Sequence, residues 1–326
     1  MSKRYAVISV GTNSTRMLLA DMVPEIPHTD AWGSIATRIG EGLGGEGELG
    51  EEPMRRTLEA IAQLYRQIRG HYVKLFAVAT SALRRAGNRD EFLNRTRDIL
   101  GVPVRVLSGE EEAEASYRGA ITALAASPSA RVGVSDAGGG STEYAVGTDV
   151  KPERVMSCEI GAVRLTEALP GLTGRDGSVD DATIERARAI AREKLAPLAE
   201  CEPVERLAFV GGSATTTAAI VRARKGMVGS YRLTRADLNA VLARLCAMTL
   251  DQRKKVIGMK PPRADILPAG IIVLDAVLEA TKLDEAIATT SDLLLGITLQ
   301  HRDATGPLAG EAELARAGSR IPKGLN

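Results

Sequence analysis

The sequence predicts an α/β protein made of two successive halves that meet at a cleft. Strand-like and helix-like patterns alternate along the 326 residues, which is typical of this class. A strand, a glycine-containing turn and a second strand occur twice, in "YAVISVGTNSTRMLLADMV" and in "RVGVSDAGGGSTEYAVG". The small, polar stretch "AASPSAR" at 125–131 suits a boundary between the halves. We therefore expect one domain over 1–126, a second over 127–303 and a poorly ordered tail over 304–326.

The first half begins with two strands and continues with alternating helices and strands. The first strand ends near Val10, and the second covers 16–22 after a tight turn. The spacing of apolar residues predicts helices at 51–69 and 90–100, and the apolar runs "KLFAVATSA" and "VPVRVLSG" predict buried strands. A third helix is expected after Ser108, because a serine followed by three acidic residues is typical of a helix start.

The second half repeats the hairpin and then adds more helices. "RVMSCEIG" predicts a further strand, and a helix is expected at 180–199. "RLAFVGGSATTTAAIV" predicts a strand, a glycine turn and a helix. The remaining helices are expected at 235–248, 251–257, 264–280 and 291–301, with "EAIATT" as a strand before the last. Because both halves begin with the same hairpin, we expect a duplicated fold.

Composition argues against several classes of function. The 42 Lys and Arg residues nearly balance the 41 Asp and Glu residues, so a general nucleic-acid or membrane-surface protein is not expected. Aromatic residues amount to only 3%, too few for a base-stacking platform. Cys158, Cys201 and Cys246 show no metal-ligand spacing and suit a reducing compartment. With no run near the ~20 apolar residues of a membrane helix and no signal peptide pattern, we expect a cytoplasmic protein without nucleic-acid or membrane partners.

The glycine turns are best explained by a phosphate ligand. Glycine lets the backbone approach a ligand closely, and successive free N–H groups make an anion-binding nest. Hydroxyl, amide and guanidinium groups beside the turns add further donors, and a turn that opens a helix offers a second anion site. The candidate residues are Gly138, Gly139, Gly140, Ser141 and Thr142 in the second hairpin, Thr12, Asn13, Ser14 and Arg16 in the first, and Gly212 and Ser213 in a third turn. Two hairpin turns that face each other could hold one phosphoryl group between them.

A purely structural role for these turns is the alternative. One Gly-Gly-Gly turn is commonly just a tight hairpin, but three turns that combine Gly with Ser or Thr, each after an apolar strand, favour a ligand. A dinucleotide-binding fingerprint fits poorly, because "GGGS" leads to a strand and not to a helix. The sequence contains no GxxxxGK[ST] phosphate loop.

Charged residues near the turns are candidates for metal binding and proton transfer. Asp136 ends one strand and Glu143 begins the next, so both carboxylates could lie at the mouth of the turn and bind Mg²⁺. Of the three glutamates at 110–112, at least two are expected on a solvated helix start, and one turned inward could act as a general base. Arg84 and Arg85 are expected in a turn, where either could neutralise a transferring phosphoryl group or lie at the surface.

At these residues the sequence resembles the exopolyphosphatase/guanosine pentaphosphate phosphatase (Ppx/GppA) family of the actin–sugar kinase–Hsp70 superfamily. The matching stretches, in family order, are "GTNSTRMLL", "AVATSALRRAGN", "LSGEEEAEASYRGA", "DAGGGSTE", "IGAVRLTE", "VGGSATT" and "RADILPAGIIVL". The resemblance implies two ribonuclease-H-like domains, as in the short form of the family. It also implies a homodimer that uses Mg²⁺, or alternatively Mn²⁺, to hydrolyse the terminal phosphate of inorganic polyphosphate. Some members act on guanosine pentaphosphate.

The resemblance also assigns roles to individual residues. The family's catalytic glutamate falls on Glu112, with Glu111 as the alternative if the register is shifted by one. Its phosphate-binding and metal-associated groups fall on Asp136, Gly138, Gly139, Gly140, Ser141 and Glu143, and its phosphate contacts in the first domain fall on Asn13, Ser14, Arg16 and Arg84. The implied reaction has the hairpins clamp the terminal phosphate while Glu112 deprotonates an in-line water, a proton transfer typically worth ~10²–10⁴-fold in rate.

One position departs from the family pattern. The first hairpin of the family reads Asp-x-Gly-Ser/Thr-Asn-Ser, and "ISVGTNS" places Ser9 where the aspartate belongs. A hydroxyl cannot replace a carboxylate near a metal ion, so weaker metal binding is expected. Three functions therefore stay open: a phosphatase acting on polyphosphate or guanosine polyphosphates, which we favour, an ATP-using kinase or ATPase of the same superfamily, and a non-catalytic polyphosphate or alarmone sensor.

Overall fold

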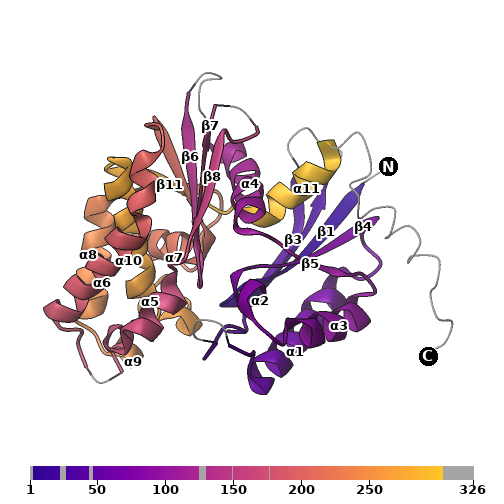
Figure 1. Cartoon of the computed structure of the whole chain (residues 1–326), viewed down its shortest axis with the longest axis horizontal. Coiled ribbons are helices and arrows are strands. Elements are labelled where there is room, and N and C mark those ends of the chain that lie inside the picture. Colours follow the sequence, from indigo (N-terminus) through magenta and orange to yellow (C-terminus); the bar gives the residue numbers. More distant parts are fainter. Residues whose placement is uncertain are drawn as a thin grey trace.

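Two α/β lobes, each built around one mixed sheet, make up the computed structural model (Figure 1). The structure describes residues 3–22, 27–43, 47–124, 130–148, 150–175 and 177–303. The expected domain boundary after residue 126 and the expected tail at 304–326 lie outside these ranges. Within them the predicted α/β class is confirmed.

The first lobe contains a five-stranded sheet in the order β3-β2-β1-β4-β5. Its elements are β1 (Arg4–Val10), β2 (Ser14–Asp21), β3 (His28–Ala36), β4 (Lys74–Ala79) and β5 (Val104–Val106), with helices α1 (Glu51–Ile68), α2 (Ser81–Arg85) and α3 (Arg89–Leu100). The central strand β1 is buried on both faces: Ala6 and Ile8 pack in the cluster that contains α1 and α3, whereas Tyr5 and Val7 pack on the opposite side. Burial on both faces explains why β1 is a continuous apolar run.

The second lobe contains a six-stranded sheet in the order β10-β11-β9-β6-β7-β8. Its strands are β6 (Val132–Ala137), β7 (Thr142–Gly147), β8 (Arg154–Cys158), β9 (Arg206–Val210), β10 (Ser230–Thr234) and β11 (Glu285–Thr289). Its helices are α5 (Ala162–Ala168), α6 (Asp181–Leu195), α7 (Gly211–Val221), α8 (Arg235–Cys246), α9 (Leu250–Lys254) and α10 (Leu267–Thr281). The apolar helix α10 is buried among α5, α6, α7 and α8. None of the helices in the described ranges is long and apolar enough to span a bilayer.

Two strands were not expected from the sequence, and both lie at sheet edges. β3 pairs only with β2, and β10 pairs only with β11. Apart from the buried Leu233 in β10, their residues are exposed or only partly buried, and Trp32 in β3 is 52% exposed. An edge strand with one solvated face needs few apolar residues, so it gives no apolar run to detect.

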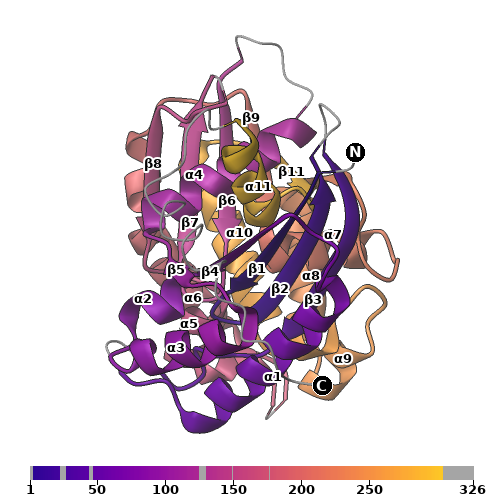
Figure 2. The same ribbon diagram turned by 90° about the vertical axis from the view of Figure 1, so that its right-hand side faces the viewer.

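Two helices lie between the lobes and contact each other along their length (Figures 1 and 2). They are α4 (Gly109–Ala120) and α11 (Leu293–Asp303). The helix α4 follows the first sheet in the chain but packs on β6, β7 and β8 of the second, whereas α11 ends the described chain and packs on β1 and β2. Gly119 and Gly296 permit this contact, because a Cβ on either would overlap a backbone carbonyl of the other segment. The crossing brings the N-terminal end of α4 to the junction of the lobes.

Candidate active site

The β1–β2 turn and the β6–β7 turn meet where the two lobes approach each other. A Cβ on Gly139 would lie 3.2 Å from Thr12 Cβ and 3.3 Å from Asn13 Cβ, so the second turn contacts the first through bare backbone. A Cβ on Gly140 would lie 2.9 Å from Thr12 Oγ1 and 2.7 Å from Ser81 Oγ. The two hairpin turns therefore face each other in the structure, the arrangement in which they could hold one phosphoryl group between them.

Free polar groups line the junction of the turns. Within the described residues, the buried atoms Thr12 Oγ1, Asn13 Oδ1 and Ser81 Oγ have no hydrogen-bond partner. The N–H groups of Gly139 and Gly140 likewise donate to no acceptor in the described part of the chain, although both carbonyls accept hydrogen bonds. Buried polar groups without partners are costly unless a ligand or water satisfies them, so this concentration is typical of a binding site.

On the second hairpin, three of the expected phosphate contacts already have other partners. The N–H of Gly138 donates to the carbonyls of Asp136 and Ser141 and so closes the turn. Thr142 Oγ1 donates to the Ile160 carbonyl at 2.7 Å, which uses the hydroxyl proton to hold the strand end. Ser141 Oγ accepts from Arg84 at 3.3 Å. The N–H groups of Gly139 and Gly140 are thus still available to an anion.

The third glycine turn is covered by an arginine that the sequence reasoning missed. A Cβ on Gly212 would overlap the guanidinium of Arg263, and Ser213 packs against α10 at Gly270. Gly212 and Ser213 belong to the first turn of α7, and the Arg263 guanidinium lies beside them. Arg263 is partly buried, and its guanidinium donates to Ser14 Oγ at 3.2 Å, so it joins the third turn to the first hairpin. Arg263 lies in "RADILPAGIIVL", one of the stretches that carry the family resemblance, and nothing else in the sequence marks it as a site residue.

Arg16 and Arg263 place two partly buried positive charges beside the first hairpin. Arg16 forms an ion pair with Asp292, which directly precedes α11. Burial lowers the pKa of the Arg263 guanidinium to about 10, and the positive charges of Arg16 and Arg38 act in the same direction. Cations that repel one another in a buried site favour an anionic ligand.

Two carboxylates face each other on the second hairpin. Asp136 and Glu143 are direct cross-strand partners on β6 and β7, and both are buried. Asp136 Oδ2 accepts from Ser116 at 3.0 Å, and Glu143 Oε1 accepts from Ser157 at 2.8 Å. Burial raises the pKa of Asp136, and burial together with the charges of Glu112 and Asp136 raises the pKa of Glu143 well above its ordinary value. Carboxylates that repel one another favour either a proton or a cation.

The three successive glutamates at the start of α4 take three different positions. Glu111 completes a capping box with Ser108, and its carboxylate also forms an ion pair with Arg105. Glu110 accepts from Ser108 Oγ at 2.9 Å on the exposed side. Only Glu112 is buried, and it points to the junction of the lobes. The geometry therefore places Glu112 in the site and turns Glu111 away from it.

Arg84 connects Glu112 to the second hairpin. Its Nη1 lies 2.6 Å from Glu112 Oε2, and its Nη2 lies 3.5 Å from Glu143 Oε1. The expectation that Arg84 and Arg85 lie in a turn was wrong, because both end the short helix α2. A helix of five residues is too short to show an apolar period, so the sequence pattern missed it.

The pKa of Glu112 predicts how a rate that depends on it varies with pH. Burial raises this pKa to about 7, although the Arg84 guanidinium opposes the shift. Since a general base acts only as the carboxylate, we expect kcat/KM to rise tenfold per pH unit up to the pKa of Glu112 and to level off above it, and a cation bound at Asp136 would move that limit below 7. Rate measurements from pH 5 to 9 at saturating metal would check this. A rate that stays level down to pH 5 would contradict a basic role for a carboxyl with this pKa.

Comparison with known proteins agrees with this geometry. The model of the Ppx/GppA phosphatase family matches residues 34–298. The chain belongs to this family. It is 33% identical to "Exopolyphosphatase 2" of Mycobacterium tuberculosis over 320 residues, covering 91% of this chain and 98% of that protein.

Solved structures of the Ppx/GppA family share the fold. A crystal structure of an exopolyphosphatase from Cytophaga hutchinsonii matches with a TM-score of 0.84 and 26% identity, covering 93% of this chain and 99% of that one. The Ppx-GppA enzyme of Aquifex aeolicus matches with a TM-score of 0.76 and 26% identity, covering 92% of this chain and 100% of that one. The predicted resemblance is confirmed, and so is the fold it implies, two α/β domains of the actin–Hsp70 type.

Proposed function

We propose that the chain removes the terminal phosphate of inorganic polyphosphate, with Glu112 as the base that activates water. The observation that carries this proposal is the position of Glu112, a buried carboxylate with a pKa of about 7. It lies beside the meeting hairpin turns and their free donors. The name of the Mycobacterium tuberculosis relative supports polyphosphate as the substrate. Action on guanosine pentaphosphate, a homodimer and a cytoplasmic location are further parts of the proposal that rest on the family resemblance.

The carboxylates on the second hairpin fit Mg²⁺, or alternatively Mn²⁺. The described residues contain no group of three or more His, Cys, Asp or Glu side chains arranged to hold a metal ion. Asp136 and Glu143 alone would therefore supply the protein ligands, which suits an ion that keeps several waters and binds substrate phosphate. Their mutual repulsion would be relieved by a cation. When bound, the ion would offset charge on the transferring phosphoryl group.

In the proposed reaction, the turns and arginines bind the phosphate and Glu112 transfers the proton. The N–H groups of Gly139 and Gly140 donate to the terminal phosphate, and the arginines beside the first hairpin neutralise it. Glu112 takes a proton from the attacking water, whose oxygen forms the new bond to phosphorus. The bridging P–O bond then breaks, and the shortened chain leaves as an oxyanion. Arg84, which pairs with Glu112 in the free protein, is placed to turn toward the phosphate as it binds.

A side-by-side assay tests the proposal against its alternatives. Phosphate release is measured with Mg²⁺ from polyphosphate, guanosine pentaphosphate and ATP. Release that is fastest from polyphosphate supports the proposal, whereas fastest release from ATP would favour a nucleotide-using enzyme of the same superfamily. Binding of polyphosphate without release from any substrate would favour a sensor, an outcome that Ser9 in place of the family aspartate keeps open.

Ser9→Asp is expected to lower the Mg²⁺ concentration needed for half-maximal rate by several-fold. Ser9 is buried, its Oγ has no partner among the described residues, and its cross-strand neighbour on β2 is Arg16. An added carboxylate there would contribute a full negative charge to a site for a hard cation. The measurements are phosphate release against Mg²⁺ concentration and calorimetric Mg²⁺ titration.

Ser9→Asn is the matched control, because it changes size without adding charge. Superimposable Mg²⁺ curves for the natural protein and Ser9→Asp would place position 9 outside the reach of the metal. An undetectable natural rate that Ser9→Asp restores would instead identify a sensor.

A further inference from the structure

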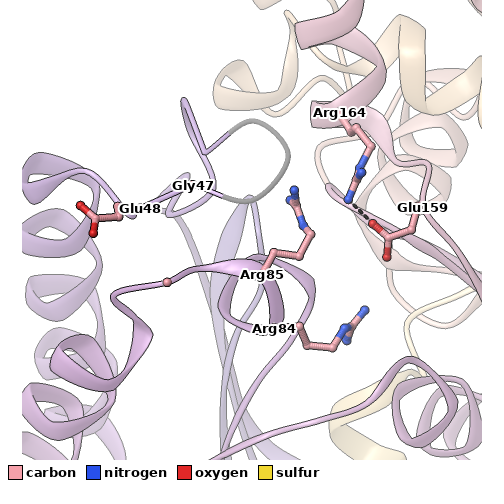
Figure 3. Close-up of a pocket in the computed structure, with 7 residues that line it drawn as sticks. Gly47, Glu48, Arg84, Arg85, Glu159 and Arg164 are labelled. Atoms are coloured by element: carbon pink, nitrogen blue, oxygen red, sulfur yellow. Dashed lines mark hydrogen bonds and ion pairs between the residues drawn. The ribbon is translucent and has the colours of Figure 1, made fainter.

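Arginines around the candidate active site are held by partners from both lobes. Arg84 and Arg85 of α2 and Arg164 of α5 line a pocket of about 710 Å³ next to the glycine turn (Figure 3). Arg164 Nε donates to the Gly140 carbonyl at 2.9 Å, and its Nη2 forms an ion pair with Glu159 (Figure 3). The Arg164 guanidinium is therefore fixed by two partners in the free protein.

Arg16, on the second strand of the first hairpin, is held by a residue from the far end of the described chain. Its Nη1 forms an ion pair with Asp292, whose side chain is buried. The cross-strand neighbour of Arg16 on β1 is Ser9, which carries no charge. Burial opposes the charge on Arg16, but the carboxylates of Asp292 and Asp136 outweigh it and raise the pKa of the guanidinium. Within the described residues, Asp292 is thus the carboxylate in direct contact with Arg16.

Asp292 lies where the chain returns from the second sheet to the first lobe. It follows β11 and directly precedes α11. Its Oδ1 accepts from the Leu294 N–H at 3.0 Å, so one oxygen fixes the start of α11 while the other, Oδ2, holds Arg16. Its carbonyl oxygen would lie 2.1 Å from a Cβ on Gly119, so its backbone packs closely on α4, the helix that carries Glu112. Arg16 is therefore anchored to the two helices that lie between the lobes.

We propose that Asp292 is a positioning residue of the active site, which holds the Arg16 guanidinium in the orientation that the transferring phosphoryl group requires. The inference rests on the proposed function and concerns a residue that acts only through Arg16. Asp292 occupies one terminal nitrogen, Nη1, so Nη2 and Nε can donate to phosphate oxygens. Electrostatic stabilisation of a transition state depends on donors that are already oriented, and an arginine side chain without a partner has many rotamers.

Asp292→Asn separates the orientation of Arg16 from its charge. The amide keeps the shape of the side chain and an oxygen that can accept from the Leu294 N–H, but it lacks the charge that holds Arg16. We expect kcat for polyphosphate to fall by about tenfold, because the guanidinium is misplaced in the transition state. Calorimetric affinity for orthophosphate should weaken by less than about twofold, since Arg16 keeps its positive charge and a neighbouring negative charge is gone.

Orthovanadate gives a readout that does not depend on turnover. Vanadate resembles phosphate in shape and charge but accepts a fifth ligand, as phosphorus does during transfer, so its affinity reports on the groups that meet the transition state. Asp292→Asn should weaken vanadate binding by about tenfold. Equal changes in vanadate and orthophosphate affinity would overturn the inference.

A double-mutant cycle tests whether Asp292 acts through Arg16. Arg16→Gln should itself lower both kcat and vanadate affinity. Adding Asp292→Asn to Arg16→Gln should then weaken vanadate binding by less than about twofold further, because the group that Asp292 holds is already gone. A second tenfold loss in the double variant would contradict the proposal, since Asp292 would then act independently of the arginine.

Asp275→Asn is the matched control, because Asp275 is also a buried aspartate paired with arginine. It lies on α10 and pairs with Arg235 at 2.8 Å and with Arg188 at 3.4 Å. Its substitution should lower the melting temperature but change kcat and vanadate affinity by less than about twofold. A tenfold loss here as well would show that turnover follows the loss of any buried ion pair, and the positioning role would be wrong.

The outcomes separate this inference from the proposed function. Polyphosphate hydrolysis that is equally fast in the natural protein and in Asp292→Asn would overturn the inference alone. Vanadate binding that depends on Asp292 and Arg16, in a natural protein that releases no phosphate from any substrate, would support the positioning role while the proposed hydrolysis fails.

Discussion

Glu112→Gln is expected to lower turnover by about 10²-fold or more while polyphosphate binding is largely kept. The amide keeps the size and polarity of the side chain but cannot accept the proton of the attacking water. Because Glu112 is buried and lies 2.6 Å from Arg84, the amide oxygen can still accept from the guanidinium, so the local structure should survive. The measurements are phosphate release at saturating polyphosphate and calorimetric affinity for the same chain.

Glu111→Gln is the control next to it in the sequence. Glu111 belongs to the capping box of α4 and pairs with Arg105, so its substitution should affect helix stability by about 1 kcal/mol and turnover by less than twofold. Loss of turnover in Glu111→Gln together with normal turnover in Glu112→Gln would show that the assignment of the base is off by one residue. Equal, small losses of turnover in both variants would show that neither glutamate is the general base.

The sequence could predict the parts of the fold that local patterns determine. The hairpin strands β1, β2, β6 and β7 are apolar runs around glycine turns, and the capping signal at Ser108 marks the start of α4. It could not predict which sheet α4 would cover. The side chains of Ala113 and Tyr117 pack with Val132 and Val134 of the second sheet, while α11 takes the place on the first. The placement of α4 on the second sheet and α11 on the first depends on contacts between segments far apart in the chain. The spacing of apolar residues within one segment does not indicate such contacts.

The residues of the candidate site were likewise predictable from the sequence only where a local motif marks them. Glycine turns and carboxylates at strand ends were visible as local motifs, and the family resemblance selected Glu112 among three glutamates. The roles of Arg263 and Arg164 were not visible, because each depends on a tertiary contact, Arg263 with Ser14 and Arg164 with the Gly140 carbonyl. An arginine in a sequence gives no sign of whether it lies in solvent or beneath a glycine turn.

Gly139→Val is expected to weaken phosphate and polyphosphate binding by at least ~10²-fold with the overall fold retained. A Cβ at position 139 would lie 3.2 and 3.3 Å from the Cβ atoms of Thr12 and Asn13, which must give by a few tenths of an ångström, and the branched valine side chain would push the two hairpin turns further apart. Separation moves the Gly139 and Gly140 N–H groups away from the donors of the first hairpin, and an anion then loses one side of its site. Circular dichroism and calorimetric titration with orthophosphate and polyphosphate are the measurements.

Val163 allows a sharper version of this experiment, because its Cγ2 would also lie 3.2 Å from a Cβ at position 139. In Gly139→Val/Val163→Ala the crowding against α5 is relieved, but the crowding against Thr12 and Asn13 remains. If binding depends on the contact between the two turns, the double variant should stay defective. If the second substitution restores binding, the single variant acted through packing against α5. Normal binding in Gly139→Val itself would mean that the glycine turn serves only the hairpin, since a phosphate that meets bare backbone cannot tolerate a branched side chain there.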